Sequence, residues 1–338
     1  MSKKNVLNVK NMNVSFKSHG QEVKAVRGVS FSVDQGEIVG LVGESGSGKS
    51  VTMKAVMGIL PDNAERTAES IFLNERELKD LSDEECRKVR GKEMTMIFQD
   101  PMTALNPLKK IGSQIEEVII RQRKCSKNEA KEKALEMLKK VGIPNPEVRL
   151  GQYPHEFSGG MRQRVLIAMA LACEPKLLIA DEPTTALDVT IQAQILDLLH
   201  ELKDEFHTSL KQDFDTSIIM ITHDMGVVAT VCSKVIIMYG GLVMESGTVE
   251  EVFYEPKHPY TKALLKAIPS LDLKEGERLQ SIPGLPPSLI DPPKGCPFAA
   301  RCEYCTERCE YATERCKNEK PEYTEFTETH RAMCFLNE

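Results

Sequence analysis

The feature that most constrains the fold is a glycine-rich segment, Gly43-Glu44-Ser45-Gly46-Ser47-Gly48-Lys49-Ser50. It fits the pattern G-x-x-x-x-G-K-[ST] and follows an apolar stretch at residues 38–42. Glycines let successive backbone N–H groups turn inward around phosphates, and a helix that begins at Lys49 adds the positive end of its dipole. The segment therefore predicts a strand, a phosphate-binding loop and a helix, and with them a site for a nucleoside triphosphate.

Individual roles follow from the chemistry of this loop. Lys49 is expected to reach the β- and γ-phosphates, and Ser50 is expected to ligate Mg²⁺. The loop and the first helical turn supply the residues that we expect to contact ATP: Gly43, Ser45, Gly46, Gly48, Lys49, Ser50 and Val51. A glycine-rich turn between a strand and a helix is the structural alternative.

A second motif lies far downstream, where the apolar run Leu177-Leu178-Ile179-Ala180 ends in Asp181 and Glu182. An acidic residue at the carboxyl end of a parallel strand can hold the Mg²⁺ of a neighbouring phosphate loop, so Asp181 is the expected ligand. A further carboxylate at the next position is suited to take a proton from the attacking water or to orient it. Glu182 is therefore the predicted catalytic base.

Between these motifs stands Phe157-Ser158-Gly159-Gly160-Met161-Arg162-Gln163-Arg164, followed by a helical run from Val165. Ser158 and the two glycines predict another helix N-terminus with exposed N–H groups, one that the chain's own phosphate loop has no obvious use for. Here the sequence resembles the nucleotide-binding subunit of an ABC transporter. In that family this signature closes over the ATP held by the partner subunit, which implies an in-trans role for Ser158, Gly159, Gly160 and Met161.

The same resemblance assigns further residues in chain order over residues 1 to about 258. Gln99 matches the Q-loop glutamine, Asp188 the D-loop and His223 the switch histidine. The resemblance implies catalytic roles for Gln99 and His223 beside Glu182, and a Mg²⁺ site formed by Ser50, Gln99 and Asp181. Phe16 matches the aromatic residue that stacks on adenine, although its period-two spacing with Met12 and Val14 equally fits a core strand.

The predicted fold is an α/β P-loop ABC ATPase with a parallel core sheet, an antiparallel β subdomain and a helical subdomain at about residues 100–175. Antiparallel strands are expected at residues 6–34, helical spacing at 112–141 up to Gly142, and buried strands at 177–182, 218–222 and 235–239. The 338 residues, 41% hydrophobic and 28% charged, suffice for this cassette at 1–258 and a smaller extension at 259–338. Residues 208–215 are expected to be a solvated insertion in a loop.

The extension narrows the resemblance. His258-Pro259-Tyr260-Thr261, Ile282-Pro283-Gly284 and Gly295-Cys296-Pro297-Phe298 resemble the C-terminal extension of ATPases that serve peptide importers, a group that also takes up nickel and glutathione. The resemblance implies a second, related ATPase subunit, with a homodimer as the alternative for the isolated chain. It also implies two membrane-spanning permease subunits and, indirectly, an extracytoplasmic solute-binding protein.

Six of the ten cysteines lie between Cys296 and Cys334. Because a reducing cytosol disfavours disulfides, such density predicts a metal site, and spacing alone fits zinc or iron–sulfur. The peptide-importer pattern falls on Cys296, Cys302, Cys309 and Cys334, so the resemblance implies a [4Fe–4S] cluster, with Zn²⁺ as the alternative. Cys305 and Cys316 do not fit this pattern. The other four cysteines, scattered along the cassette, are expected to be inert.

Composition and charge restrict the location and the partners. The first five residues lack the apolar segment of a signal peptide, and no apolar run reaches the ~18 residues that span a bilayer, so a peripheral protein at the cytoplasmic face of the membrane is expected. A net charge of −6 argues against general binding of nucleic acid. The sequence thus predicts an ATPase subunit of a peptide importer. The rivals are a nickel or glutathione importer, a soluble ABC protein of translation or DNA repair, and a metal-binding regulator that only binds nucleotide.

Overall fold

The structure is a computed structural model that divides into two compact units. The helical unit comprises Met1–Val6, Asp34–Glu37 and Asp80–Ile221, and the P-loop unit comprises Leu7–Val33, Ile38–Lys79 and Thr222–Glu338. The residues that the structure describes are 4–18, 20–183, 192–195, 216–268, 281–307 and 310–337. The predicted insertion at 208–215 lies outside the described residues, and the predicted domain boundary after residue 258 stays a prediction.

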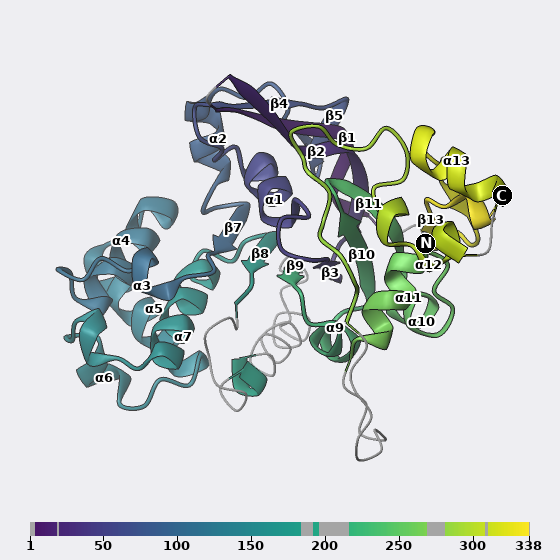
Figure 1. Ribbon diagram of the computed structural model, residues 1–338. Coiled ribbons are helices and arrows are strands. Elements are labelled where there is room, and N and C mark those ends of the chain that lie inside the picture. Colours follow the sequence, from purple (N-terminus) through teal and green to yellow (C-terminus); the bar gives the residue numbers. More distant parts are fainter. Residues whose placement is uncertain are drawn as a thin grey trace, which may run out of the picture. The chain divides into compact units, whose positions relative to one another are not determined.

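The helical unit combines short helices with three parallel strands (Figure 1). Strand β8 pairs in parallel with β7 on one side and β9 on the other. Every residue of β8 and β9 is buried, as expected of parallel strands that are covered on both faces. The strands are β7 (Met94–Ile97), β8 (Leu177–Asp181) and β9 (Ser217–Thr222), and the helices are α2 (Asp83–Val89), α3 (Pro101–Ala104), α4 (Ile111–Arg123), α5 (Lys127–Lys140), α6 (Pro146–Arg149), η1 (Pro154–Glu156) and α7 (Gly159–Leu171).

The predicted helical stretch at 112–141 forms two helices rather than one. Helix α4 ends where Lys124 adopts a left-handed conformation with φ of 52°. Helix α5 begins after Ser126, which exchanges hydrogen bonds with Glu129 in a capping box. Gly142, with φ of 69°, follows the last turn of α5, so the predicted end of this helical region is correct.

The P-loop unit contains an antiparallel sheet built largely from the first eighty residues. Its strands pair in the order β2-β1-β5-β6, and β4 also pairs with β1. This sheet holds the strands predicted at residues 6–34. The bounds are β1 (Asn5–Ser18), β2 (Gln21–Asp34), β4 (Ala64–Thr67), β5 (Ser70–Leu73) and β6 (Arg76–Glu77).

A second group of strands in the same unit begins with β3, which precedes the phosphate-binding loop, and ends with short strands from the C-terminal part of the chain. Strand β3 is parallel to β10, which pairs antiparallel with β11, and the short strands β13 and β12 continue outward from β11. The bounds are β3 (Ile38–Val42), β10 (Lys234–Tyr239), β11 (Leu242–Thr248), β12 (Thr324–Glu325) and β13 (Arg331–Ala332), with helices α1 (Lys49–Met57), α9 (Met225–Val231), α10 (Val249–Tyr254), α11 (Pro259–Lys266), η2 (Ala299–Arg301), α12 (Glu303–Glu307), α13 (Glu310–Asn318) and η3 (Phe335–Asn337).

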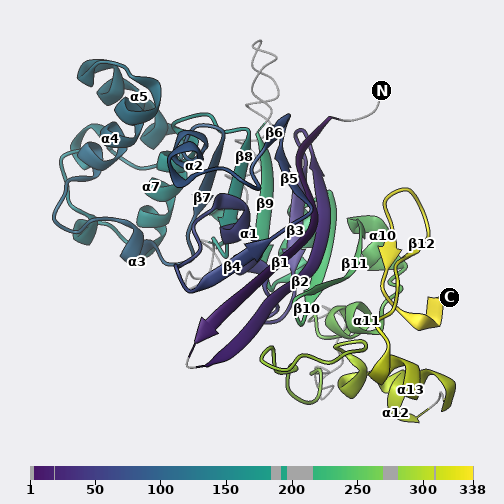
Figure 2. The same ribbon diagram turned by 90° about the horizontal axis from the view of Figure 1, so that it is seen from above.

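The C-terminal segment packs onto this second group of strands. Figures 1 and 2 both show the yellow C-terminal elements beside α10, α11 and β11. Tyr239, Tyr260 and Phe298 form the aromatic centre of the shared core, with ring centroids 4.5 to 5.5 Å apart. Arg27 of β2 donates to the carbonyl oxygen of Pro293 at 2.9 Å, and the amide of Lys24 donates to the carbonyl oxygen of Leu289 at 2.8 Å. The extension is therefore part of the folded core of the P-loop unit.

Across the described residues, none of the helices has both the length and the apolar character that crossing a bilayer requires.

A buried histidine in this core makes the stability depend on pH. The Nδ1 atom of His258 caps α11 by accepting the amide of Tyr260 at 3.0 Å, and burial lowers the pKa of His258 from 6.5 to about 4. Because the unfolded chain binds this proton at a higher pH than the folded chain, we expect the free energy of unfolding to fall between pH 6.5 and 4, by up to about 3 kcal/mol. Above pH 6.5 this contribution is constant.

Urea unfolding at pH 7, 6 and 5 measures the effect. His258→Asn keeps an oxygen that can cap the helix but does not titrate, so its stability should change less over this range. An identical pH dependence in the two proteins would contradict the assignment.

Candidate nucleotide-binding site

The phosphate-binding loop has the conformation that its glycines permit. Gly43 has φ of 155°, and a Cβ atom there would collide with the carbonyl oxygen of Met238. Gly48 has φ of 100°, and its Cβ would lie 2.5 Å from the carbonyl oxygen of Ala25. Only glycine fits at either position, because the left-handed conformation and the close backbone both exclude a side chain. The loop thus leaves a backbone cradle ahead of helix α1.

Lys49 begins α1 and turns its ammonium group back into the loop. Its Nζ atom donates to the carbonyl oxygens of Gly43 at 2.7 Å and Glu44 at 2.9 Å, and the residue is only 5% exposed. A buried ammonium group beside a helix N-terminus fits the negative charge of a phosphate chain. Ser50 and Val51 lie half-buried in the first turn of α1. Ser45 and Gly46 are exposed at the tip of the loop.

Of the acidic pair at the end of β8, Glu182 lies beside Gln99. Asp181 is buried, and the Nε2 atom of Gln99 donates to Oε2 of Glu182 at 2.8 Å. Glu182 has φ of 46°, an uncommon conformation for a residue with a side chain, and its amide donates to the carbonyl oxygen of Ile221 at 2.9 Å. Such a conformation costs about 1–3 kcal/mol and is typical of functional sites. The backbone here sets the direction of the Cα–Cβ bond of Glu182.

The signature segment forms the N-terminus of α7, as the sequence predicted. Ser158 is the N-cap residue, and its hydroxyl accepts the amide of Met161 at 3.3 Å. Ser158 and Gly159 are exposed, Met161 is half-buried, and Gly160 is buried. This end of a 13-residue helix is therefore open to a binding partner that carries negative charge.

The remaining predicted residues lie at separate places. His223 is exposed directly after β9 and precedes Asp224, whose side chain caps α9. Phe16 lies on β1 opposite Ala64 of β4 and is half-buried, whereas Met12 and Val14 on the same strand are buried. Asp188 lies outside the described residues. The structure therefore groups Gln99 with Glu182 in the helical unit, and the phosphate loop belongs to the P-loop unit with Phe16 and His223.

The predicted iron–sulfur cluster is wrong, and the described residues give no support to its zinc alternative. In the part of the chain that the structure describes, no group of three or more His, Cys, Asp or Glu residues is placed to hold a metal ion. Cys309, one of the four predicted ligands, lies outside the described residues. The other three, Cys296, Cys302 and Cys334, are buried in the core of Tyr260 and Phe298, as are Cys305 and Cys316.

The described cysteines of the extension lie among apolar side chains. Burial raises the pKa of Cys302 and of Cys334 to about 11, and it raises the pKa of Cys296 as well. In this core the three cysteines pack as small apolar side chains.

Two residues that contact the loop were not predicted as site residues. Tyr260 and Arg301 both hydrogen bond to Glu44, the second residue of the loop. The motif His258-Pro259-Tyr260 marked the segment that supplies the first, but no sequence pattern connected Arg301 with a loop 257 positions away.

Comparisons with known proteins agree with this geometry. Residues 26–185 match the family described as ABC transporter, and residues 244–309 match the oligopeptide/dipeptide transporter C-terminal region. The chain is 56% identical to the oligopeptide transport ATP-binding protein OppD of Bacillus subtilis, over 98% of this chain and 88% of that protein. It is 55% identical to the dipeptide transport ATP-binding protein DppD of the same organism, over 88% of this chain and 86% of that protein.

A solved structure of an ATP-binding cassette supports the same relation. The dimeric post-hydrolysis state of the cassette MJ0796, bound to ADP and Pi, matches with a TM-score of 0.63 and 28% identity, over 72% of this chain and 98% of that chain. The predicted family and the predicted ABC ATPase fold are thus confirmed. The chain belongs to the ATP-binding proteins of the oligopeptide and dipeptide ABC transporter family.

Proposed function

We propose that this protein binds and hydrolyses ATP and thereby energises the uptake of dipeptides or oligopeptides through a membrane transporter. The observation that carries the proposal is the hydrogen bond from Gln99 to Glu182, because it places the amide of Gln99 beside the carboxylate that directly follows the buried Asp181. The names of the relatives, which refer to oligopeptide and dipeptide transport, support peptides as the transported substrates. The match to the transporter C-terminal region favours this function over a soluble ABC protein of translation or repair.

Each residue has a distinct task in hydrolysis. Lys49 and the loop amides hold the phosphates of ATP, and Phe16 stacks on its adenine. Ser50, Gln99 and Asp181 would hold Mg²⁺, which when bound neutralises negative charge on the phosphates. Glu182 accepts a proton from the water that attacks the γ-phosphate, and His223 assists at the same phosphate. The motif order along the chain and the family support this assignment.

Assembly completes the site. Two ATP-binding subunits close head to tail, so that the N-terminus of α7 in one subunit, with Ser158 to Met161, covers the ATP of the other. Asp188 belongs to the same interface. We propose that the partner is a second, related ATPase, that two permease subunits anchor the pair at the cytoplasmic face of the membrane, and that an extracytoplasmic solute-binding protein delivers the peptide. The exposed Ser158 and Gly159 support the in-trans contact.

Reconstitution into liposomes with the cognate permease subunits, partner ATPase and solute-binding protein tests the transported class. ATP-dependent uptake of a labelled tripeptide that exceeds uptake of nickel and glutathione is the expected result. Uptake of nickel or glutathione without peptide uptake would replace the proposed substrate. If adding the permease subunits left the rate of ATP hydrolysis unchanged, the alternative of a soluble ABC protein of translation or DNA repair would be favoured.

The loop lysine should set the affinity for ATP. Lys49→Ala is expected to weaken ATP binding by the isolated chain about 10- to 100-fold, since a hydrogen bond to a charged group contributes ~1.5–3 kcal/mol. Titration calorimetry with MgATP measures the change. Lys54→Ala, in the last turn of the same helix, is the matched control and should bind as the unaltered protein does.

A further inference from the structure

Glu44 of the phosphate-binding loop is held by two residues from the C-terminal extension. Its backbone amide donates to the hydroxyl oxygen of Tyr260 at 3.0 Å. Its carboxylate oxygen Oε2 accepts from Nη1 of Arg301 at 2.8 Å, and this ion pair is largely shielded, since the side chain of Arg301 is only 6% exposed. Main chain and side chain of one loop residue are therefore both anchored to the extension.

Arg301 is itself fixed, so it can act as an anchor. Its Nη1 atom also donates to the hydroxyl of Tyr239 at 2.9 Å, and its Nε and Nη2 atoms donate to the carbonyl oxygens of Pro283 at 2.8 Å and Ile282 at 3.1 Å. Although burial opposes its charge, the hydrogen bonds to Glu44 and Tyr239 raise the pKa of Arg301. The guanidinium group lies over the rings of Tyr239 and Phe298, which adds cation–π contacts. The side chain of Arg301 is thus held by several partners at once.

Tyr260 is equally constrained. It is fully buried between Tyr239 and Phe298, with ring centroids 4.5 and 5.2 Å away. Burial raises the pKa of Tyr260, so the hydroxyl stays neutral. Its position is fixed by helix α11, whose N-terminus is capped by His258. The hydroxyl therefore offers the Glu44 amide a rigid acceptor.

The anchored residue also contacts the lysine that binds phosphate. The carbonyl oxygen of Glu44 accepts from Nζ of Lys49 at 2.9 Å, next to the carbonyl of Gly43. A shift of Glu44 would consequently displace both the loop backbone and the ammonium group. We propose that Arg301 and Tyr260 are positioning residues for nucleotide binding, which hold Glu44 so that the loop keeps its open shape and the extension sets the affinity for ATP.

This inference rests on the proposed function, and one variant tests it from the side of the extension. Arg301→Gln is expected to raise the KM for ATP about tenfold, which corresponds to about 1.4 kcal/mol, while kcat at saturating ATP stays within about twofold. The reason is that the substitution removes the ion pair that holds Glu44 and leaves Gln99 and Glu182 unchanged. Arg301→Lys keeps the charge and should restore part of the affinity.

A second variant removes the same ion pair from the side of the loop. Glu44→Gln should raise the KM similarly, and the double variant should be no worse than either single one, because both remove one interaction. Since Glu44 is partly exposed, this variant remains informative if Arg301→Gln does not fold. The melting temperature of each protein separates loss of affinity from loss of fold.

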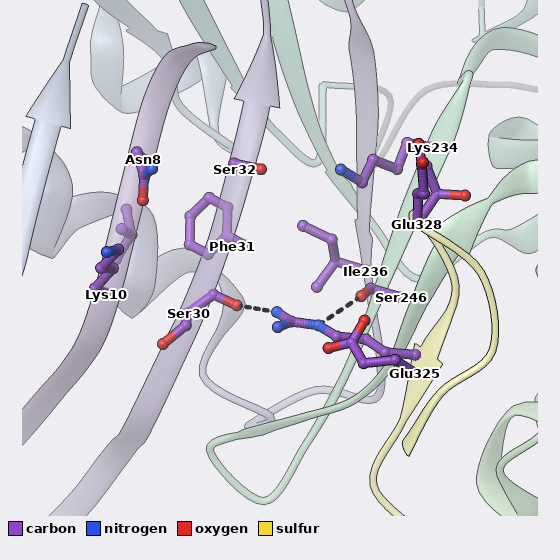
Figure 3. Close-up of a pocket in the computed structure, with 13 residues that line it drawn as sticks. Asn8, Lys10, Ser30, Phe31, Ser32, Lys234, Ile236, Ser246, Glu325 and Glu328 are labelled. Carbon is purple, nitrogen blue, oxygen red and sulfur yellow. Dashed lines mark hydrogen bonds between the residues drawn. The ribbon is translucent and has the colours of Figure 1, made fainter. Parts of the chain in front are cut away.

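The matched control is Arg331→Gln, which loosens the extension at a place remote from the loop in sequence and contacts. Arg331 donates hydrogen bonds to the hydroxyl of Ser246 and the carbonyl oxygen of Ser30. Figure 3 shows both bonds beside a pocket of about 270 Å³. Its KM for ATP should be unchanged. The inference is overturned if Arg301→Gln and Glu44→Gln keep the original KM, or if Arg331→Gln raises it as much. If the unaltered chain itself binds no ATP, the proposed function fails instead.

Discussion

Glu182→Gln is expected to lower the rate of ATP hydrolysis about 100- to 10,000-fold while ATP binding persists. The amide has the shape of the carboxylate but cannot accept a proton from the attacking water. Its hydrogen bond with Gln99 can be retained, because the glutamine side chains can reorient donor and acceptor. Such a variant should therefore accumulate the closed, ATP-bound dimer, which size-exclusion chromatography with the partner ATPase would reveal.

Glu132→Gln is the matched control, since Glu132 is an exposed glutamate on α5 of the same unit. Its hydrolysis rate should equal that of the unaltered protein. If Glu182→Gln also hydrolysed ATP at that rate, another group would have to be the base.

Gly159→Leu should abolish ATP-driven dimerisation while the isolated chain still binds ATP. Gly159 is exposed in the first turn of α7. A side chain there would occupy the space next to the helix N-terminus that the proposed assembly gives to the phosphates of the ATP bound by the partner subunit. Dimer formation by the Glu182→Gln variant, with and without the added substitution, measures the effect. Nucleotide affinity of the monomer is measured separately.

Gly151→Leu is the comparison, because Gly151 is an exposed glycine of the same unit that lies before the signature. It should dimerise normally. Equal loss of monomer binding in Gly159→Leu would show that this glycine serves the chain's own nucleotide instead.

Much of the fold was predictable because local chemistry and long-range packing agree. The motif places glycine at 43 and 48, where the structure leaves no room for a side chain, and the apolar run before Asp181 is the buried strand that its pattern predicts. The break at Lys124 inside the predicted helical stretch was not anticipated, since the apolar spacing continues through it, although the capping pair Ser126 and Glu129 was a readable signal.

The cysteine cluster failed as a prediction for a physical reason. Spacing along a chain does not say whether thiols face one another around an ion or lie in a core. Cys296, Cys302 and Cys334 share the surroundings of Tyr260 and Phe298, and burial raises the pKa of each thiol. Many of the apolar residues that share this core come from β10, β11 and α11, which the spacing of the cysteines does not reveal.

The ion pair between Glu44 and Arg301 has a consequence for biosynthesis, because it joins residues 257 positions apart. At ~5–20 residues per second, the ribosome needs roughly 13 to 50 s to make the chain between them. Until then the nascent loop has neither of its anchors, since Tyr260 too is made late. The nucleotide site would thus be completed only when translation is nearly finished. A chain whose synthesis stops before Arg301 would have a loop with weakened affinity for ATP.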